Sequence, residues 1–465
     1  MRRLTLHAIA SCALAGCTVG PDYHRLDVAG VKAPWVGPIA PGQVDDHWWR
    51  TLHDPALDAL VDAALAHNLD IAEAEANLRQ ARANREVAAS ALAPRINASA
   101  SVQETQVSAN GELPVNRLPG FSREFSLFDG GFDASWEVDL WGAVRRSVQE
   151  ARARGDESAA ALADTRLRVV AEVVRAWSDL RAAQARLASA RTDVALRSAI
   201  VDLVGQRLAA GEATQADADT AGKRLAAARA VLPGLQSQAS VAAYALALLT
   251  GRPPEATTDL LAAEGPLPPT PPIVAGAIRS EFLERRPDVR AAEADLAALT
   301  ADVGVQTANL FPRFALAGSV GQQSQSVSDL ALAGSTRFSI GPSFSWPVFS
   351  AGKIRAQIRA AKAGADASAA RYEHAVLSAL SDSETAINRY SASLDALGRY
   401  SEQHQQSRHL AGLAAERFQK GEDDKLALLE AQSAERAADQ SEIAAQADAI
   451  NAYISLEKSL AGGLT

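Results

Sequence analysis

Apolar and polar residues alternate along four stretches of this chain, at about 94–104, 125–139, 312–321 and 337–349. Ile96 and Val102 alternate with Asn97 and Gln103 in the first stretch. Alternation over about ten residues predicts β-strands with one apolar face. Nine of the 11 phenylalanines lie within 121–132 and 311–349, which concentrates aromatic side chains on these strands. The pattern suits a membrane-facing β wall, and a half-buried sheet in a soluble protein is the alternative.

A helical periodicity replaces the alternation after Trp141 and after Ser350. It runs for about 65 residues each time, a helix of about 100 Å at 1.5 Å per residue. In the first of these helices, apolar residues recur at strict sevens: Val173, Leu180, Leu187, Val194, Val201 and Leu208. A Gly-Glu pair follows each long helix, and a second helix then returns to Leu249 or to Leu460. Heptads of this length predict two coiled-coil helical hairpins.

The two halves of the chain are repeats of each other. Residues 70–95 align with 288–313 at an offset of 218, and the pairs Trp136/Trp346 and Arg207/Arg417 align at an offset of 210. A unit of about 200 residues is far longer than a solenoid repeat, so each half should be a complete structural module. We therefore divide the chain into a first repeat at 68–251, a linker at 252–287 and a second repeat at 288–465.

The N-terminus has the features of a secretion signal. Arg2 and Arg3 precede a mostly apolar stretch, and Leu14-Ala15-Gly16-Cys17 closes it like a bacterial lipobox. Residues 1–16 are then a signal peptide, and 17–67 begin the mature chain and form an equatorial region. We expect Cys17 to carry the lipid, as N-palmitoyl and S-diacylglycerol groups. Cys12 is the one other cysteine and leaves with the signal, so the mature chain has no disulfide.

Four strands are too few to close a sheet in a membrane. Membrane barrels need at least about eight strands, and open sheet edges are not tolerated in lipid. Other copies of the chain must therefore complete the barrel. Two, three or four copies would each suffice on this argument.

Composition and motifs exclude other classes of function. There are 46 Lys+Arg residues against 55 Asp+Glu, which leaves no basic footprint for nucleic acid. No Walker loop, HExxH or paired CxxC motif is present, so we predict no enzyme, no catalytic residues and no metal site. His404 and His409 are five residues apart, the wrong spacing for one helix face, and are expected on the solvated surface.

Two acidic residues follow the hairpin turns. Asp217 lies six residues after Gly211, and Glu430 lies nine after Gly421. In a closed ring of chains, one acid per chain would form a circle of like charge that attracts cations. Ordinary solvated helix carboxylates are the alternative for both positions.

Several motifs together resemble a known family. They are Gly20-Pro21-Asp22-Tyr23, Trp48-Trp49, Asp54-Pro55-Ala56-Leu57, Leu249-Thr250-Gly251-Arg252-Pro253-Pro254 and Arg285-Arg286-Pro287-Asp288-Val289-Arg290. With the lipobox, they are similar to those of the NodT-type efflux lipoproteins among the TolC-like outer membrane factors. The resemblance covers essentially the whole chain.

The resemblance implies a mainly α fold with transmembrane β-strands. Each chain would give four strands to a 12-stranded trimeric barrel in the outer membrane, and its hairpins would form an α-barrel in the periplasm. The implied partners of the homotrimer are outer-membrane lipid, a periplasmic membrane-fusion adaptor and an inner-membrane RND-type transporter. The implied function is passive export, including antibiotic efflux.

The resemblance also implies roles for residues at the hairpin tips. Asp217, Glu430 and Phe418 would form the periplasmic aperture. Gly211, Glu212, Gly421 and Glu422 would contact the adaptor. The family has a second acid where this chain has Ala427, and a tyrosine where it has Phe418, so a double acidic ring and a hydroxyl latch are not expected.

Two other functions remain open from the sequence. One is the outer channel of a type I protein-secretion system, from which the lipobox and the 285–290 motif point away. The other is a structural coiled-coil lipoprotein, which would have no membrane-embedded strands.

Overall fold

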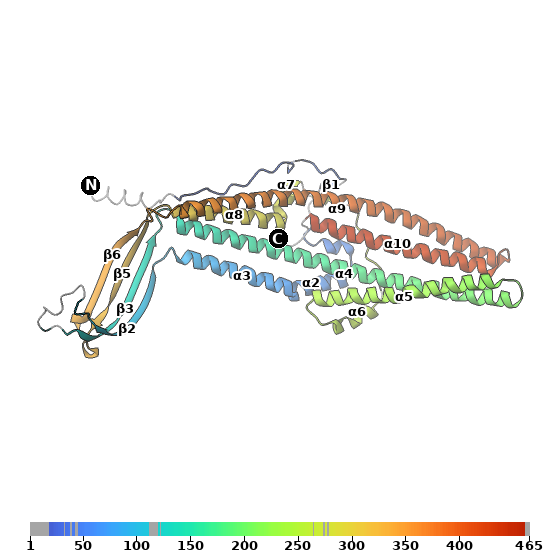
Figure 1. The fold of residues 1–465 in the computed structure, drawn as a ribbon. Coiled ribbons are helices and arrows are strands. Elements are labelled where there is room, and N and C mark those ends of the chain that lie inside the picture. The colour runs from blue at the N-terminus through green and yellow to red at the C-terminus, as the bar shows by residue number, and fades with distance from the viewer. Residues whose placement is uncertain are drawn as a thin grey trace. The chain divides into compact units, whose positions relative to one another are not determined.

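Each half of the chain folds as helix, two strands, long helix and helix, as the periodicities predict (Figure 1). The computed structural model describes residues 18–31, 33–37, 40–41, 45–110, 120, 122–263, 265–272, 275–276 and 279–460. Cys17 lies outside the described residues. The first half contains α3 (Leu69–Ser90), β2 (Arg95–Gln106), β3 (Glu124–Val138), α4 (Ala143–Ala209) and α5 (Gln215–Leu249). The second contains α8 (Pro287–Ala308), β5 (Arg313–Ser324), β6 (Thr336–Ser345), α9 (Lys353–Lys420) and α10 (Lys425–Ser459).

The remaining elements are short. They are β1 (Ala40–Pro41), η1 (Trp48–Leu52), α2 (Pro55–His67), η3 (Pro254–Thr257), α6 (Thr258–Ala262), β4 (Ala275–Gly276), α7 (Arg279–Arg285), η4 (Val327–Asp329) and η5 (Ala333–Ser335). No helix among the described residues is long and apolar enough to cross a membrane.

The compact units of the fold do not coincide with the repeats. One unit comprises Leu78–Glu157, Ala292–Tyr372 and the described part of Met1–Leu26. The other comprises the described residues of Asp27–Asn77, Ser158–Ala291 and Glu373–Thr465. Each unit takes corresponding segments from both halves. Each sequence repeat therefore contributes residues to both compact units.

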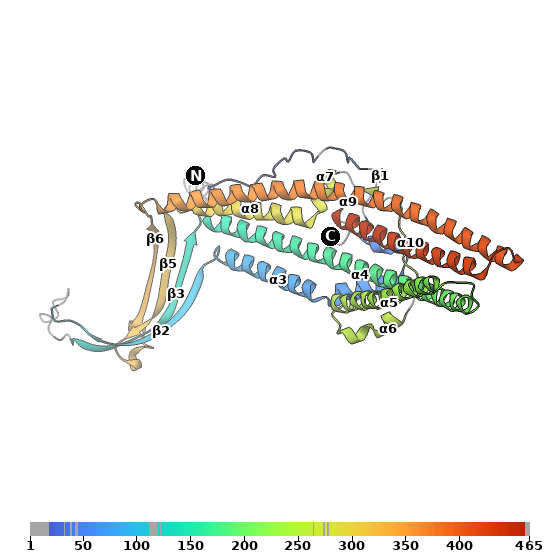
Figure 2. The ribbon, with the colours of Figure 1, turned by 45° about the vertical axis from the view of Figure 1, so that its right-hand side comes forward.

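The first unit contains one antiparallel sheet in the order β2-β3-β5-β6 (Figure 2). Eleven residue pairs, from Phe128↔Ser324 to Val138↔Phe314, join the two hairpins of the chain along β3 and β5. The alternation predicted from the sequence holds in this register, because Phe132 lies opposite Val320, and Val320 lies opposite Phe338. β6 ends at Ser345 rather than at 349, because Ser345 pairs with Arg313, the first residue of its partner strand β5.

One face of this sheet is apolar and exposed. Phe338 and Ile340 are 79% and 75% exposed, and Ile96, Val102, Phe132, Val320 and Phe344 are also exposed. A contiguous apolar face of this size marks a surface that meets lipid or another protein.

A matched pair of tryptophans connects the strands to the preceding helices. The indole N–H of Trp136 donates to the Leu92 carbonyl at 3.0 Å, and that of Trp346 donates to the Leu310 carbonyl at 3.0 Å. Both carbonyls lie just past a helix end, where backbone oxygens have no intrahelical partner. Both halves of the chain therefore keep the tryptophan and also its hydrogen bond to the end of the preceding helix.

The second unit contains most of the two helical hairpins, including both tips, and an aromatic core. Its largest fully buried side chains include Trp48, Trp49, Trp177, Tyr390, Tyr453, Leu180 and Ile450. Of the six heptad positions predicted for α4, Val173 and Leu180 are completely buried, and Leu187, Val194, Val201 and Leu208 are half-buried. The Trp177 indole donates to Asp54 at 2.7 Å and so connects α4 to the start of α2.

This core also contains a buried acid. Glu457 is 1% exposed, and its Oε2 has no hydrogen-bond partner among the described residues. Burial raises the pKa of this carboxyl to about 7. Glu457 is therefore largely protonated below neutral pH.

Candidate functional site

The two hairpin tips have the same backbone geometry. Gly211 and Gly421 adopt φ of +79° and +74°, a left-handed conformation that favours glycine. The next amides donate back across each turn, from Glu212 to the Arg207 carbonyl at 2.8 Å and from Glu422 to the Arg417 carbonyl at 2.9 Å. These are the bonds of a helix C-cap, and they place Glu212 and Glu422 at equivalent points of the two tips.

The helices that leave the tips are capped by different residues. In α5, the Thr214 hydroxyl and amide donate to Asp217 Oδ2 at 2.7 and 2.9 Å, and the Asp217 amide donates back to the hydroxyl. In α10, the Asp424 carboxylate caps the helix without a second side chain, and it accepts a hydrogen bond from the Ala427 amide at 2.8 Å. Since 214 and 424 are equivalent positions, the second repeat has an aspartate where the first has a capping threonine, and needs no second acid.

Capping changes how Asp217 is interpreted. Its hydrogen bonds from Thr214 lower the pKa of the carboxyl, which is therefore ionised. They are also the only hydrogen bonds or ion pairs that the described residues make with that carboxyl. As predicted, Asp217 lies in the helix just after the turn. Its carboxylate is nevertheless oriented by its own helix end, a constraint that the sequence argument did not include.

Glu430 instead takes part in a contact between helices. Its Oε1 lies 3.5 Å from Arg224 Nη1 on α5. A second pair joins Arg207 at the end of α4 to Asp424, with Nη2 and Oδ2 2.9 Å apart. Both pairs connect the first hairpin to the second near the tips. Phe418 is 39% exposed, and its carbonyl accepts a bond from the Gly421 amide at 3.0 Å.

Asp424 and Arg207 are not among the site residues predicted from the sequence. Asp424 stands three residues after Gly421, as Thr214 stands three after Gly211. Extending the repeat alignment by three positions would have identified it as a cap. The pairing with Arg207 could not be predicted, because it depends on how the two hairpins pack.

A second charged group lies on the polar face of the sheet. Arg337 on β6 reaches across β5 to Asp129 on β3, with Nε 2.7 Å from Oδ2, and Gln323 donates to the same oxygen at 2.8 Å. Gly321 of β5 lies opposite Arg337 in the register. A fork of this kind is geometrically specific. The ion pair connects β6 of the second strand hairpin to β3 of the first, near Phe128, where the β3–β5 pairing begins.

The segment after the lipobox is attached to the first unit. The Val19 amide donates to the Trp141 carbonyl at 3.1 Å, and Arg146 forms an ion pair with Asp22 at 2.8 Å. Gly142 has φ +81°, and a Cβ at this position would lie 3.0 Å from the Thr18 Cα. Thr18 is thus held beside the end of β3.

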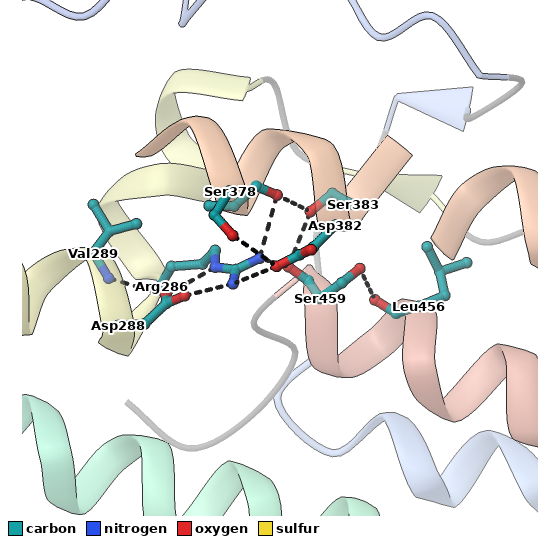
Figure 3. Close-up of polar contacts among 9 residues, drawn as sticks. Arg286, Asp288, Val289, Ser378, Asp382, Ser383, Leu456 and Ser459 are labelled. Carbon is teal, nitrogen blue, oxygen red and sulfur yellow. Dashed lines mark hydrogen bonds and ion pairs between the residues drawn. The ribbon is translucent and has the colours of Figure 1, made fainter. Parts of the chain in front are cut away.

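Arg286, in the motif at 285–290, connects the start of α8 to the last helix of the second repeat (Figure 3). Its Nη1 donates to the carbonyls of Ser459 and Ala379 at 3.1 and 3.3 Å, while Asp288 accepts from Nε at 2.9 Å. The start of α8 is thereby joined to the end of α10 and to α9. These contacts give Arg286 and Asp288 of the motif a structural role, which is to hold three helices together.

Asn68 has the equivalent role in the first repeat. It donates to the Leu249 carbonyl at 3.0 Å and accepts from the Ile71 amide at 3.1 Å. Positions 68 and 286 match at an offset of 218, and Leu249 and Ser459 match at 210. Each repeat is therefore closed by one polar side chain on the last carbonyl of its final helix.

No group of histidine, cysteine, aspartate and glutamate side chains in the described ranges could hold a metal ion.

The family model for outer membrane efflux proteins matches residues 60–252 and 278–462. The pyoverdine export outer membrane protein OpmQ of Pseudomonas aeruginosa is 30% identical, over 100% of this chain and 97% of its own length. The solvent efflux pump outer membrane protein SrpC of Pseudomonas putida is 29% identical, over 100% and 99%.

Solved structures agree with the sequence relatives. The outer-membrane channel OprN superposes with a TM-score of 0.85 at 35% identity, covering 96% of this chain and 99% of that one. The open state of the Neisseria gonorrhoeae MtrE outer membrane channel gives a TM-score of 0.80 at 26% identity, covering 96% and 99%.

Proposed function

Since this chain belongs to the outer membrane efflux protein family and is an outer-membrane channel of an efflux pump, we propose that three copies form a passive exit duct. The observation that carries this is the four-stranded sheet of the first unit. It exposes an apolar face, and β2 and β6 have no further strand partner among the described residues. Three such sheets joined edge to edge would close into twelve strands with the apolar faces toward lipid.

The relatives decide between the functions that the sequence left open. They are export and efflux channels rather than enzymes, and they favour efflux over a type I protein-secretion channel. A purely structural coiled-coil lipoprotein does not fit a chain that superposes on channels over 96% of its length.

We propose that Cys17 anchors the duct through N-palmitoyl and S-diacylglycerol groups. Thr18 is held next to Trp141, just past β3, so a lipid on the preceding residue would emerge at that end of the sheet. Tryptophans are enriched at membrane–water interfaces, and Trp136 lies at the same end. Radiolabelled palmitate should enter the wild type and not Cys17→Ala. Equal labelling of both would refute the anchor.

We propose that the hairpin tips form the periplasmic aperture and bind the adaptor, beneath which an inner-membrane RND-type transporter operates. Gly211, Glu212, Gly421 and Glu422 provide the exposed turns for the adaptor. Glu430 and Asp217, with Phe418, line the aperture. The Arg207–Asp424 and Arg224–Glu430 pairs hold the two hairpins of a chain together there. Opening the aperture would require these pairs to separate.

Single-channel recording from the purified protein in planar bilayers tests the proposal. The wild type should conduct, and the double variant Arg207→Gln with Arg224→Gln should be open for a larger fraction of the time. Lys223→Gln, on the same helix as Arg224, is the matched control and should leave gating unchanged. If neither the wild type nor the double variant conducts, the chain is not a duct.

A further inference from the structure

His404 is buried among carboxylates, contrary to the solvated position that its sequence spacing suggests. It lies on α9 and is 5% exposed, whereas His409 is exposed. Its Nδ1 contacts Glu442 of α10 directly. Its Nε2 faces two more carboxylate oxygens of α10, Glu435 Oε1 and Asp439 Oδ1, each at 3.9 Å.

The surrounding side chains determine which charge the ring can hold. Arg408 on α9 lies 3.7 Å from Glu435, Arg436 on α10 contacts Glu435 and Asp439, and Ser189 on α4 donates to Asp439 at 2.7 Å. Three carboxylates and two guanidiniums leave one negative charge on the cluster. An imidazolium at His404 cancels that charge, and a neutral imidazole does not.

The position of Nε2 leads to the same form of the ring. With Nδ1 donating to Glu442, a neutral His404 would direct the bare lone pair of Nε2 at two anions. The Nε2 atom has no hydrogen-bond partner among the described residues and is shielded from solvent. Both carboxylate oxygens lie 3.9 Å from Nε2, beyond hydrogen-bond reach, so a proton on Nε2 would act on them through its charge. The imidazolium therefore places a positive charge beside two carboxylates, where the neutral ring would place a lone pair.

The first repeat shows that the fold does not require this cluster. α5 and α10 are both 35 residues long and correspond at an offset of 210. At that offset His404, Glu435 and Glu442 correspond to Val194, Leu225 and Leu232. These three positions of the first hairpin are apolar, while Asp439 corresponds to Arg229. The second hairpin thus has charged groups at positions where hydrophobic side chains suffice.

We propose that His404 is a proton-binding site, which ties α9 to α10 while it is protonated and releases them when the proton is lost. Histidine is the side chain that titrates near neutral pH, so the site would couple the packing of the second hairpin to the pH around it. The first hairpin, with apolar residues at these positions, would not respond. The inference stands on contacts within one chain and does not depend on the proposed duct.

Deuterium exchange at the histidine C2–H, followed by mass spectrometry across pH, tests the site in the full-length protein. The exchange rate of each histidine reports its own protonation. The pH at which His404 loses its proton should be the pH at which amide exchange in α9 and α10 departs from its ordinary chemical pH dependence. Loss of the His404 proton without any such change in α9 and α10 would overturn the proposal.

A variant that copies the first repeat tests the consequence for packing. His404→Val, Glu435→Leu and Glu442→Leu together replace the ionic contact with the apolar residues of the first hairpin. Backbone amide exchange in α9 and α10 should speed up in the wild type as the pH rises through the loss of the His404 proton. In the triple variant it should follow only the ordinary chemical pH dependence of amide exchange over that range. A wild type whose exchange follows only the ordinary chemical pH dependence would contradict the switch, and that result does not require the variant to fold.

Discussion

The two repeats of this chain share a backbone and differ in what their helices bury. Tyr390, Tyr453 and Glu457 in the core of the second repeat correspond at an offset of 210 to Leu180, Ala243 and Ala247, all equally buried. The tips, the tryptophan contacts and the closing contacts at Asn68 and Arg286 follow the duplication more closely. Geometry was thus kept at the ends of elements, where backbone groups need partners. Along the helices, where any well-packed set of side chains suffices, the two copies diverged.

The largest difference between the repeats should appear at their closing contacts. Arg286→Met leaves the Ser459 and Ala379 carbonyls without this donor and Asp288 without its ionic partner. We expect a loss of about 3–5 kcal/mol of stability, mainly from the two hydrogen bonds that the guanidinium donates to carbonyls, since the Asp288 carboxylate is 43% exposed. Asn68→Ala removes one cap and one carbonyl contact, and should cost only about 1–2 kcal/mol. Thermal melts of the two variants measure the contrast. Equal losses would show that the two closures are equivalent in strength.

The buried acid of the second repeat should give the next largest effect. The pKa of Glu457 is about 7 in the fold against an ordinary 4.5. Between these values the unfolded chain loses the proton and the folded chain keeps it, so stability falls as pH rises and stays reduced above about 7. Glu457→Gln should remove this loss, which amounts to roughly 3 kcal/mol.

Melting temperatures of the wild type and Glu457→Gln, taken from pH 4 to 9, check this expectation. The difference between the two melting temperatures should grow as the pH rises and level off above neutrality. Any effect of the glutamine side chain that does not depend on pH shifts this difference equally at every pH. Ala247, the equivalent position in the first repeat, has no titratable group. A difference that does not vary with pH would mean that Glu457 is ionised within the fold.

The sequence predicted the elements of this fold better than its contacts. Alternation located all four strands, and the heptads predicted the seam at Val173 and Leu180, because both patterns arise from local geometry. The burial of His404 and the partner of Glu430 depend on which helix faces meet, and no local pattern encodes that. Asp217 illustrates the limit within a single site. Its position after the turn was predicted, yet its hydrogen bond to Thr214 gives the carboxylate a structural role that its charge alone does not suggest.

The tryptophan contacts should be nearly identical in the two repeats. Trp136→Phe and Trp346→Phe each keep the ring and lose one N–H donor to a carbonyl at 3.0 Å. Each should cost about 1 kcal/mol, and the two losses should agree. Melts of the two variants measure this. A much larger loss at one position would show that the duplicated contacts have acquired different roles.

The smallest effect is expected where the repeats differ by a single capping residue. Asp217→Ala leaves Thr214 without its partner, so the first turn of α5 should fray, and amide exchange at 215–218 should rise. The turn of α10 at 425–428 should be unaffected, because Asp424 caps it without a second acid. The hydrogen bonds from Thr214 lower the pKa of Asp217, so its cap is present above the ordinary aspartate range and is lost only as the pH falls below it. If Asp217 also lines the aperture, Asp217→Ala should reduce the cation preference of the channel along with the fraying. Glu430→Gln should reduce that preference without fraying, since Glu430 caps no helix, and this pair of variants separates the charge of the aperture from the stability of the helix that carries it.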